Sequence, residues 1–409
     1  MNYIALFTSD IVGFICGLLS SVFVARHLGP KIYGSYIFIM LILAYFQHFG
    51  RFRESVSILP YLKNHSEHEK TIFSLGFLIN CLMGTITTFM LIAIGSFFSL
   101  FSDFSDWIYP LLSLMIFCEY FLIFTTYALS YQAKFKLLAG LTTIRPVLQT
   151  AGFAYLYFFA NSQKAVLQYF IVNAGAMLLT ALVGAYLIRN YINLSFLQYR
   201  EINIKLYVKN SLLFYLTDIV DFFTKKGVAT FVAAKLAVSN LAYFSMIFTH
   251  FDLLRFPNSA LGTMMYPALS KETSDKKQRA YISHKVFFNF LIFPPILVAA
   301  FFLYPKLVIL FYGPEYEIIT HYFPYILLIG APYLITYPIS HYFSSNGAPH
   351  FEGIINVFSL SLQIISVLLF SYLKDFSLLF AVLSQAFGFA GFTFALLFTY
   401  KYRRLNSHE

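Results

Sequence analysis

The chain has 409 residues, of which 59% are hydrophobic and only 11% are charged, and its formal net charge is +10. Soluble chains have about 25% charged residues, so this composition excludes a soluble globular protein. Apolar stretches long enough to cross a bilayer core of about 30 Å as helices recur along the whole sequence. The sequence therefore predicts an all-α polytopic membrane protein.

Twelve of these stretches are predicted as membrane-spanning helices. They cover residues 4–25, 34–60, 71–100, 107–130, 137–160, 165–188, 210–233, 242–268, 285–312, 319–343, 353–373 and 376–400. The first is expected to be a retained span and not a signal peptide, because it lacks a basic leader and carries Asp10. All three cysteines fall inside spans, which argues against a disulfide framework.

A short corner, "ARHLGPKIYGSY", follows the first span at residues 25–36. Pro30 fixes its own φ and is expected to end the first helix. Glycine at positions 29 and 34 permits a tight reversal and the close approach of two backbones. Tyr33 and Tyr36 are expected as aromatic anchors at the outer membrane interface.

Charged residues inside the predicted spans are the candidates for function, because each costs at least about 2.5 to 3.5 kcal/mol at mid-bilayer unless it faces protein or water. Six bases and six acids fall there: Arg51, Arg53, Arg145, Lys225, Lys226, Arg255, Asp10, Glu54, Glu119, Asp218, Asp221 and Asp252. Asp218, Asp221 and Lys225 share one helical face, and Asp221 and Lys225 have the spacing of an ion pair. Two interpretations stay open, a charge-lined cavity and mutual neutralisation within helices.

The loops between the spans carry an uneven distribution of Lys and Arg. With both termini placed in the cytoplasm, eighteen of these residues face inward and six face outward. Cytoplasmic loops retain Lys and Arg, so this asymmetry predicts cytoplasmic termini and explains the basic charge without nucleic-acid binding. The amphipathic segment near 189–209 is interpreted as a surface-lying connection between two halves.

The two halves show weak internal repetition. Residues 233–244 after the seventh span correspond to residues 25–36 after the first, at an offset of 208, and residues 345–355 correspond to 131–141 at an offset of 214. Like loops therefore follow like spans, as in transporters built from repeats. We expect an N-terminal six-helix half at 1–190, a cytoplasmic linker at 191–209 and a C-terminal six-helix half at 210–409. A pseudo-two-fold axis along the membrane normal is expected to relate the halves.

Two motifs carry a family resemblance. Leu28-Gly29-Pro30 followed by Tyr33-Gly34-Ser35-Tyr36, and the turn at residues 311–316, "FYGPEY", resemble the polysaccharide repeat-unit flippases. That family exports O-antigen and capsule units and belongs to the multidrug/oligosaccharidyl-lipid/polysaccharide (MOP) exporter superfamily. The resemblance implies a MATE/MOP-like fold in the bacterial inner membrane. It also implies alternating access for an undecaprenyl-diphosphate-linked oligosaccharide used in lipopolysaccharide O-antigen or capsule synthesis, with a polysaccharide polymerase and chain-length machinery as partners.

The resemblance also assigns site residues. Arg255 matches a basic position on the eighth span of related lipid-linked-precursor flippases, and Arg51 or Arg53 matches one on the second. Guanidinium and ammonium groups suit a diphosphate through charge-assisted hydrogen bonds. The expected substrate-binding residues are Arg255, Lys225, Lys226, Arg145, Arg53 and Arg51. The expected ion-coupling residues are Asp218, Asp221, Asp10 and Glu119.

Enzyme motifs are absent from the sequence: it has no Walker loop, no H-E-x-x-H, no G-x-S-x-G and no cysteine or histidine metal cluster. We therefore expect no catalytic residues, no metal and no cofactor. Two alternatives stay open. A multidrug cation antiporter of the same superfamily needs an acidic aromatic cavity, against which six bases count. An integral-membrane oligosaccharide polymerase or ligase needs a sizeable outward loop, and the predicted outward loops are short.

Overall fold

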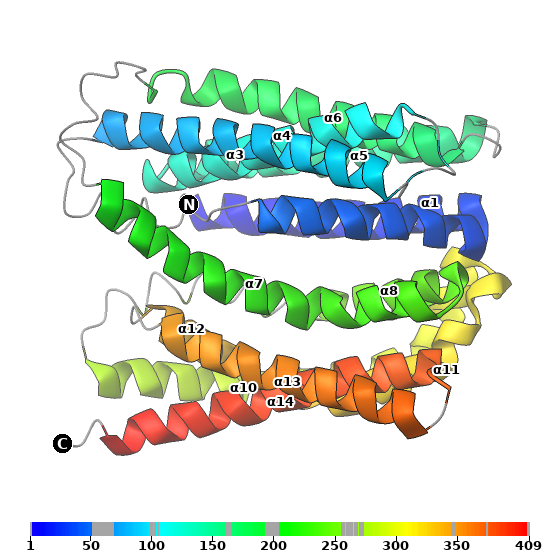
Figure 1. Cartoon of the computed structure of the whole chain (residues 1–409). Helices are drawn as coiled ribbons and strands as arrows, with labels where there is room; N and C mark the ends of the chain where they lie inside the picture. Colours follow the sequence, from blue (N-terminus) through cyan, green and yellow to red (C-terminus); the bar gives the residue numbers. More distant parts are fainter. Residues whose placement is uncertain are drawn as a thin grey trace. The chain divides into compact units, whose positions relative to one another are not determined.

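The computed structural model describes residues 2–50, 69–98, 101, 104, 106–160, 165–192, 204–254, 258, 265, 269, 274–345, 349–373 and 375–406. Within this part of the chain every regular element is a helix, as Figure 1 shows. The long helices are α1 (Asn2–Phe49), α3 (Glu69–Phe97), α4 (Ile108–Tyr131), α5 (Phe135–Phe159), α6 (Ala165–Ile188), α7 (Ile204–Lys235), α8 (Val238–Leu254), α10 (Asp275–Tyr312), α11 (Ile318–Thr336), α13 (Pro349–Leu373) and α14 (Leu378–Asn406). The prediction of an all-α chain is confirmed.

Each of the twelve predicted spans overlaps one of these helices. Eight helices in the described residues are long and apolar enough to cross a membrane. The helices α5, α7 and α8 are not among the eight, because α5 and α7 carry polar and charged residues and α8 has only 17 residues. The predicted span 4–25 and the part of the span 34–60 up to Phe49 lie on the single element α1, and residues 51–60 lie outside the described residues.

The α1 element contains a break at Gly29, where the backbone takes φ 67° and ψ 167°. This left-handed φ is accessible to glycine at little cost, and Pro30 follows as the first residue of the next helical stretch. The expected tight corner is therefore present. Tyr33 and Tyr36 are each only 6% exposed, with their rings stacked at 6.2 Å, so their expected role as interfacial anchors is wrong: they are packed inside the protein.

The helices form two compact units. Unit 1 comprises Met1–Leu28 and Ile39–Leu216, and unit 2 comprises Gly29–Phe38 and Thr217–Glu409. Residues 193–203 of the expected linker lie outside the described residues, so the expected halves at 1–190 and 210–409 and the axis between them stay predictions.

Unit 1 is a bundle in which α4 packs against α3 and α6, and α6 packs against α5. The fully buried Tyr120 of α4 places its hydroxyl 3.1 Å from the carbonyl oxygens of Phe46 and Gln47 in α1. In the part of α1 before the break at Gly29, the Ser9 hydroxyl donates to the carbonyl oxygen of Ala139 in α5 at 3.0 Å. Polar contacts of this kind hold helices together where lipid offers no hydrogen bonds.

Unit 2 is built around α14, which packs against α11 and α13, while α10 packs against α11. The 3-10 helices η4 (Pro314–Tyr316) and η5 (Tyr337–Ile339) and the short α12 (Ser340–Ser345) complete it. The corner belongs to this unit: a Cβ added at Gly34 would lie 2.1 Å from the carbonyl oxygen of Val238. The predicted close approach of two backbones at Gly34 is confirmed.

A fully buried tyrosine closes the turn after α10. Tyr316 in η4 lies with its ring centroid 6.0 Å from those of Tyr243 and Tyr312. Burial raises the pKa of the Tyr316 phenol well above its ordinary value. The phenol therefore stays neutral at physiological pH and acts as a packing group.

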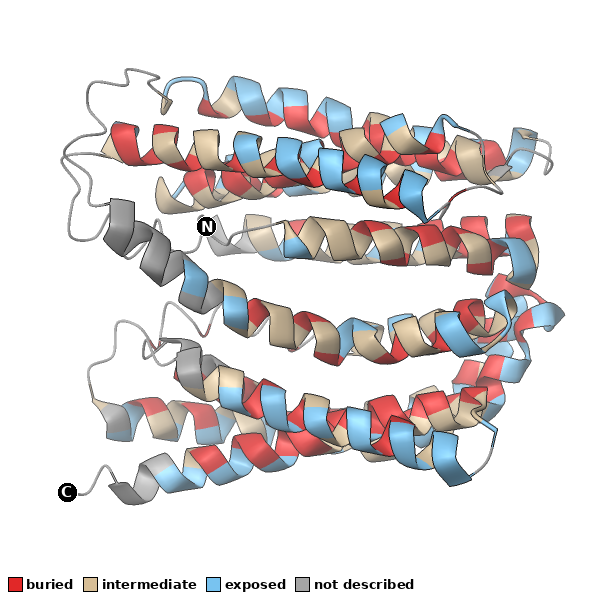
Figure 2. Ribbon diagram, viewed as in Figure 1, coloured by how far each residue is buried: buried red, intermediate tan, exposed pale blue. Residues whose placement is uncertain are grey.

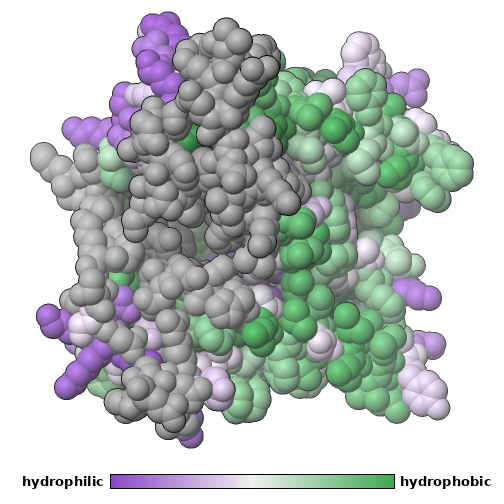
Figure 3. Space-filling model, turned by 60° about the vertical axis from the view of Figure 1, so that its left-hand side comes forward, coloured by the Kyte–Doolittle hydropathy of each residue, from purple (hydrophilic) through white to green (hydrophobic). Residues whose placement is uncertain are grey.

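Large apolar side chains are also exposed on the helices, as the alternation of buried and exposed residues in Figure 2 indicates. Examples are Leu328 at 73% and Phe302 at 68% exposure. Hydrophobic residues cover much of the described surface on the face shown in Figure 3. Such a surface is suited to lipid and not to water.

Candidate functional site

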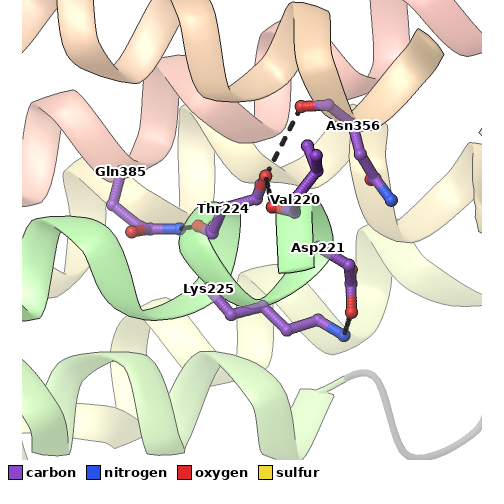
Figure 4. A network of polar contacts seen from close by, with 6 residues as sticks. All are labelled: Val220, Asp221, Thr224, Lys225, Asn356 and Gln385. Atoms are coloured by element: carbon purple, nitrogen blue, oxygen red, sulfur yellow. Dashed lines mark hydrogen bonds and ion pairs between the residues drawn. The ribbon is translucent and has the colours of Figure 1, made fainter. Parts of the chain in front are cut away.

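The charged face of α7 lies in unit 2 (Figure 4). The ammonium of Lys225 donates to Oδ2 of Asp221 at 2.6 Å, and the two side chains are 51% and 31% exposed. The ion pair expected from their spacing is confirmed. Asp218, one turn earlier on the same face, is only 5% exposed.

This ion pair lines a pocket of about 160 Å³ inside unit 2. Five helices contribute to it: α7, α8, α11, α13 and α14. Its lining residues are Asp221, Thr224, Lys225, Lys226, Ala229, Phe244, Ser245, Phe248, Thr249, Asp252, Tyr333, Asn356, Ser359, Gln385, Phe389 and Phe392. The charges of α7 therefore border a cavity, as the cost of charge in a membrane requires.

A hydrogen-bond network fixes α7 against α13 and α14 beside the pocket (Figure 4). The Thr224 hydroxyl lies 2.9 Å from the carbonyl oxygen of Val220 and 3.4 Å from that of Asn356. The carbonyl oxygen of Thr224 in turn accepts from Nε2 of Gln385 and from Nε2 of Gln363, both at 2.9 Å. One turn of α7 is thus held in a defined position on the two neighbouring helices.

The pocket's charges come in both signs. The exposed Lys226 interacts electrostatically with Asp252 of α8, while Lys225 is paired with Asp221. Two ammonium and two carboxylate groups therefore offset each other among the described lining residues. The pocket offers both hydrogen-bond donors and acceptors and carries no net excess of positive charge.

Aromatic rings form another part of the lining. Phe389 of α14 is stacked with Phe251 at 5.0 Å and with Tyr333 at 4.8 Å between ring centroids. Phe248 of α8 lies 4.5 Å from Phe244 and is only half-buried. The pocket thus combines a charged side with an aromatic one.

His250 of α8 is not among the residues that line the pocket. Its ring is buried, with Nδ1 2.8 Å from the hydroxyl of Tyr304 and Nε2 3.0 Å from that of Tyr312. One phenol can donate and the other can accept, so a neutral imidazole is fully satisfied there. We therefore interpret His250 as a structural residue that joins α8 to α10.

Two other candidate residues meet in unit 1. Nη1 of Arg145 in α5 donates to Oε2 of Glu119 in α4 at 2.8 Å, with the two side chains 32% and 26% exposed. Asp10 lies half-buried on α1, and its carboxylate forms no hydrogen bond or ion pair with the residues that the structure describes. Arg145 and Glu119 therefore neutralise each other across two helices.

Three expected substrate-binding residues, Arg255, Arg53 and Arg51, lie outside the described residues. Their expected roles stay predictions. The structure adds neutral residues to the site that sequence reasoning did not single out, above all Phe248, Asn356 and Gln385. No charge or motif marked them, although a Gln or Asn in an apolar helix is itself an unusual signal.

Comparison with known proteins gives a family and a fold. Residues 23–320 match the family described as polysaccharide biosynthesis protein. No curated protein matches the sequence significantly.

Solved structures share the fold over nearly the whole chain. An inward-facing multidrug resistance MATE family transporter of the MOP superfamily superposes with a TM-score of 0.72 at 14% identity, covering 99% of this chain and 98% of that one. The lipid II flippase MurJ in an inward closed conformation gives 0.71 at 17% identity, with 98% and 87% covered. A MOP superfamily transporter from Pyrococcus furiosus Vc1, described as having a binding pocket of reverse polarity, gives 0.71 at 14% identity, with 98% and 95% covered. The predicted polytopic, MATE/MOP-like fold is confirmed.

Proposed function

Because the chain belongs to the polysaccharide biosynthesis protein family, we propose that it is a flippase that moves a lipid-linked oligosaccharide across the bacterial inner membrane by alternating access. The substrate is an undecaprenyl-diphosphate-linked repeat unit for O-antigen or capsule synthesis. A polysaccharide polymerase and chain-length machinery act on the exported unit. The fold shared with transporters supports this proposal.

The observation that carries the proposal is a charged, polar pocket set into apolar helices. Asp221, Lys225 and Lys226 of α7 border it, and charge in a membrane protein is maintained where a polar substrate or ion is bound. We assign the diphosphate to Arg255 with Lys225 and Lys226, and Arg145, Arg53 and Arg51 are further candidates. Arg145 is the weakest of these, because Glu119 already occupies one side of its guanidinium.

Transport needs a driving force, which we assign to an ion gradient. Asp218, Asp221, Asp10 and Glu119 are the candidate coupling carboxylates, because a carboxylate in a cavity changes protonation or ion occupancy as its exposure to water changes. Asp221 is favoured because it lines the pocket, and Asp218 because it is a buried carboxylate one turn earlier on the same helix. Substitution by asparagine at the three aspartates is expected to abolish gradient-dependent export, and export retained in all three would remove them as candidates.

Two alternatives make different predictions. A multidrug cation antiporter, like the MATE transporter that shares the fold, would alter the susceptibility of cells to cationic drugs. If the protein were an oligosaccharide polymerase or ligase, its loss would leave single unpolymerised units on the cell surface. The two carboxylates of the described pocket lining are offset by two ammonium groups, so the lining has no excess of negative charge that would favour a cation.

Deletion of the gene, followed by mass analysis of undecaprenyl-linked intermediates, tests the proposal. The complete repeat unit is expected to accumulate on the inner leaflet, and expression of the wild-type chain should reverse this. Drug susceptibility should not change. Surface display of single repeat units would instead indicate a polymerase and contradict the proposal.

We propose that both termini and the 271–285 loop are cytoplasmic. In a background without the three native cysteines, Ser274→Cys should resist an impermeant thiol reagent in intact cells and react after permeabilisation. Ala237→Cys, in the exposed connection between α7 and α8, is the matched control and should react in intact cells. Labelling in the reverse pattern would overturn the orientation.

A further inference from the structure

Gln385 of α14 lines the pocket of unit 2, and its amide is fixed on α7. Gln385 is 2% exposed, and its Nε2 donates to the carbonyl oxygen of Thr224 at 2.9 Å. A carbonyl oxygen can only accept, so this bond fixes the orientation of the amide and makes Oε1 the remaining atom. Within the described residues Oε1 is buried without a hydrogen-bond partner. Gln385 therefore shapes the wall of the pocket, and its buried Oε1 is not open to a ligand.

Asp221 presents an acceptor to the pocket. Oδ2 of Asp221 accepts from Lys225, whereas Oδ1 has no hydrogen bond to any part of the chain that the structure describes. The amide of Asn356 also lines the pocket and has no side-chain hydrogen bond among these residues. Ionised phosphate oxygens only accept hydrogen bonds, whereas hydroxyl and ammonium groups donate them. The unsatisfied oxygens therefore favour a hydroxyl-bearing group over a phosphate.

One aromatic ring is available to such a group. Phe389 is 8% exposed, and its ring is already stacked with those of Phe251 and Tyr333. Phe248 is half-buried and is supported by Phe244 at 4.5 Å and Phe389 at 6.3 Å. The face of an aromatic ring carries partial negative charge, which suits the polarised C–H bonds of a sugar ring. Phe248 is therefore held in place by its neighbours, and part of its side chain remains exposed at the pocket.

The size and charge of the pocket limit its occupant. Its volume of about 160 Å³ is close to the ~150 Å³ of an engineered protein cavity that admits one benzene ring. One six-membered ring therefore fits, and a whole oligosaccharide does not. The two ammonium and two carboxylate groups of the lining offset each other, which favours a neutral or zwitterionic ring.

We propose that this pocket is a subsite for one pyranose ring of the exported glycan. The ring lies on Phe248, and one of its hydroxyls donates to Oδ1 of Asp221. A phosphate attached to the glycan stays outside the subsite, where Lys226 can contact it. This subsite rests on the proposed function, because the glycan is the substrate of that function.

Saturation-transfer NMR on the purified full-length chain in detergent tests the subsite, with free glucose, galactose and N-acetylglucosamine as probes. At least one sugar is expected to bind through its ring protons. Phe248→Leu should weaken binding several-fold, up to about tenfold, as expected for the loss of one aromatic contact, and Phe248→Tyr should retain it. Asp221→Asn should also weaken binding, because the amide is a poorer acceptor. Phe394→Leu, on α14 at a position 63% exposed, is the matched control and should bind like the wild type.

Unchanged melting temperatures identify the variants that fold. The proposal is overturned if no probe binds the wild type, or if folded Phe248→Leu and Phe394→Leu bind equally well. Deletion and complementation in cells separate this result from the proposed function. If sugars bind but lipid-linked units do not accumulate in the deletion strain, the proposed flippase function is wrong and the sugar site remains. If the units accumulate but no sugar binds, only the proposed subsite is wrong.

Discussion

Among the described residues, unit 1 has the ion pair of Glu119 with Arg145 and unit 2 has that of Asp221 with Lys225, and these two pairs differ in what surrounds them. Glu119 and Arg145 join two helices of unit 1, whereas Asp221 and Lys225 lie one turn apart on α7. The pair of unit 2 is the more exposed and borders a pocket. An ion pair therefore has a different role in each unit. The Glu119–Arg145 pair links two helices, whereas the Asp221–Lys225 pair places charged groups at a cavity.

The largest loss of stability is expected from Arg145→Gln. This change leaves Glu119 without its cation inside the bilayer, at a cost of about 2 to 3 kcal/mol. The melting temperature of the purified protein measures it. The double variant Arg145→Gln with Glu119→Gln should recover most of the loss, because no uncompensated charge remains. Equal destabilisation in the single and double variants would mean that the pair does not tie the two helices.

A smaller effect is expected from Ser9→Ala in the same unit. Its hydroxyl donates to Ala139 of α5 and also lies 2.8 Å from the hydroxyls of Thr142 and Thr143. Hydrogen bonds between membrane helices contribute about 0.6 kcal/mol on average, so the melting temperature should fall slightly. Export should not change, since this contact holds α1 on α5 and borders no pocket residue. A clear loss of export at normal protein level would contradict a structural role.

The smallest change in stability is expected at the pair of unit 2. Lys225→Ala removes an exposed i,i+4 pair worth about 0.2 to 0.5 kcal/mol, so the melting temperature should stay close to that of the wild type. Export should nevertheless fall, because the proposed function needs this charge. Lys235→Ala, a substitution of a basic residue in the last turn of the same helix, is the control and should export normally. Wild-type export by Lys225→Ala would remove the pair of unit 2 from the site.

The comparison also shows which contacts the sequence could predict. Asp221 and Lys225 are four residues apart, so helical spacing alone brings them together. Glu119 and Arg145 are 26 residues apart, and no local rule pairs positions on different helices. Gly34 was predictable for a similar reason, because a glycine in a corner between two spans indicates close backbone contact.

Neutral site residues were beyond sequence reasoning. Phe248 is one of 50 phenylalanines, and its availability depends on which rings are already stacked in the folded unit. Gln385 is unusual only because its amide is committed to Thr224, a residue on another helix. Hydropathy located the helices well, since burial in lipid acts on whole segments, but it carries no information about single contacts.

The corner at residues 29–38 has a consequence for motion. Because Gly29–Phe38 belongs to unit 2 while the residues on either side belong to unit 1, the backbone passes between the units three times, after Leu28, Phe38 and Leu216. Any change in their relative placement has to be absorbed by torsions at these three junctions. The first adjoins Gly29, which has the widest choice of φ and ψ of any residue type. Gly29→Ala should therefore destabilise the corner itself, because φ 67° with ψ 167° strains any residue that carries a Cβ.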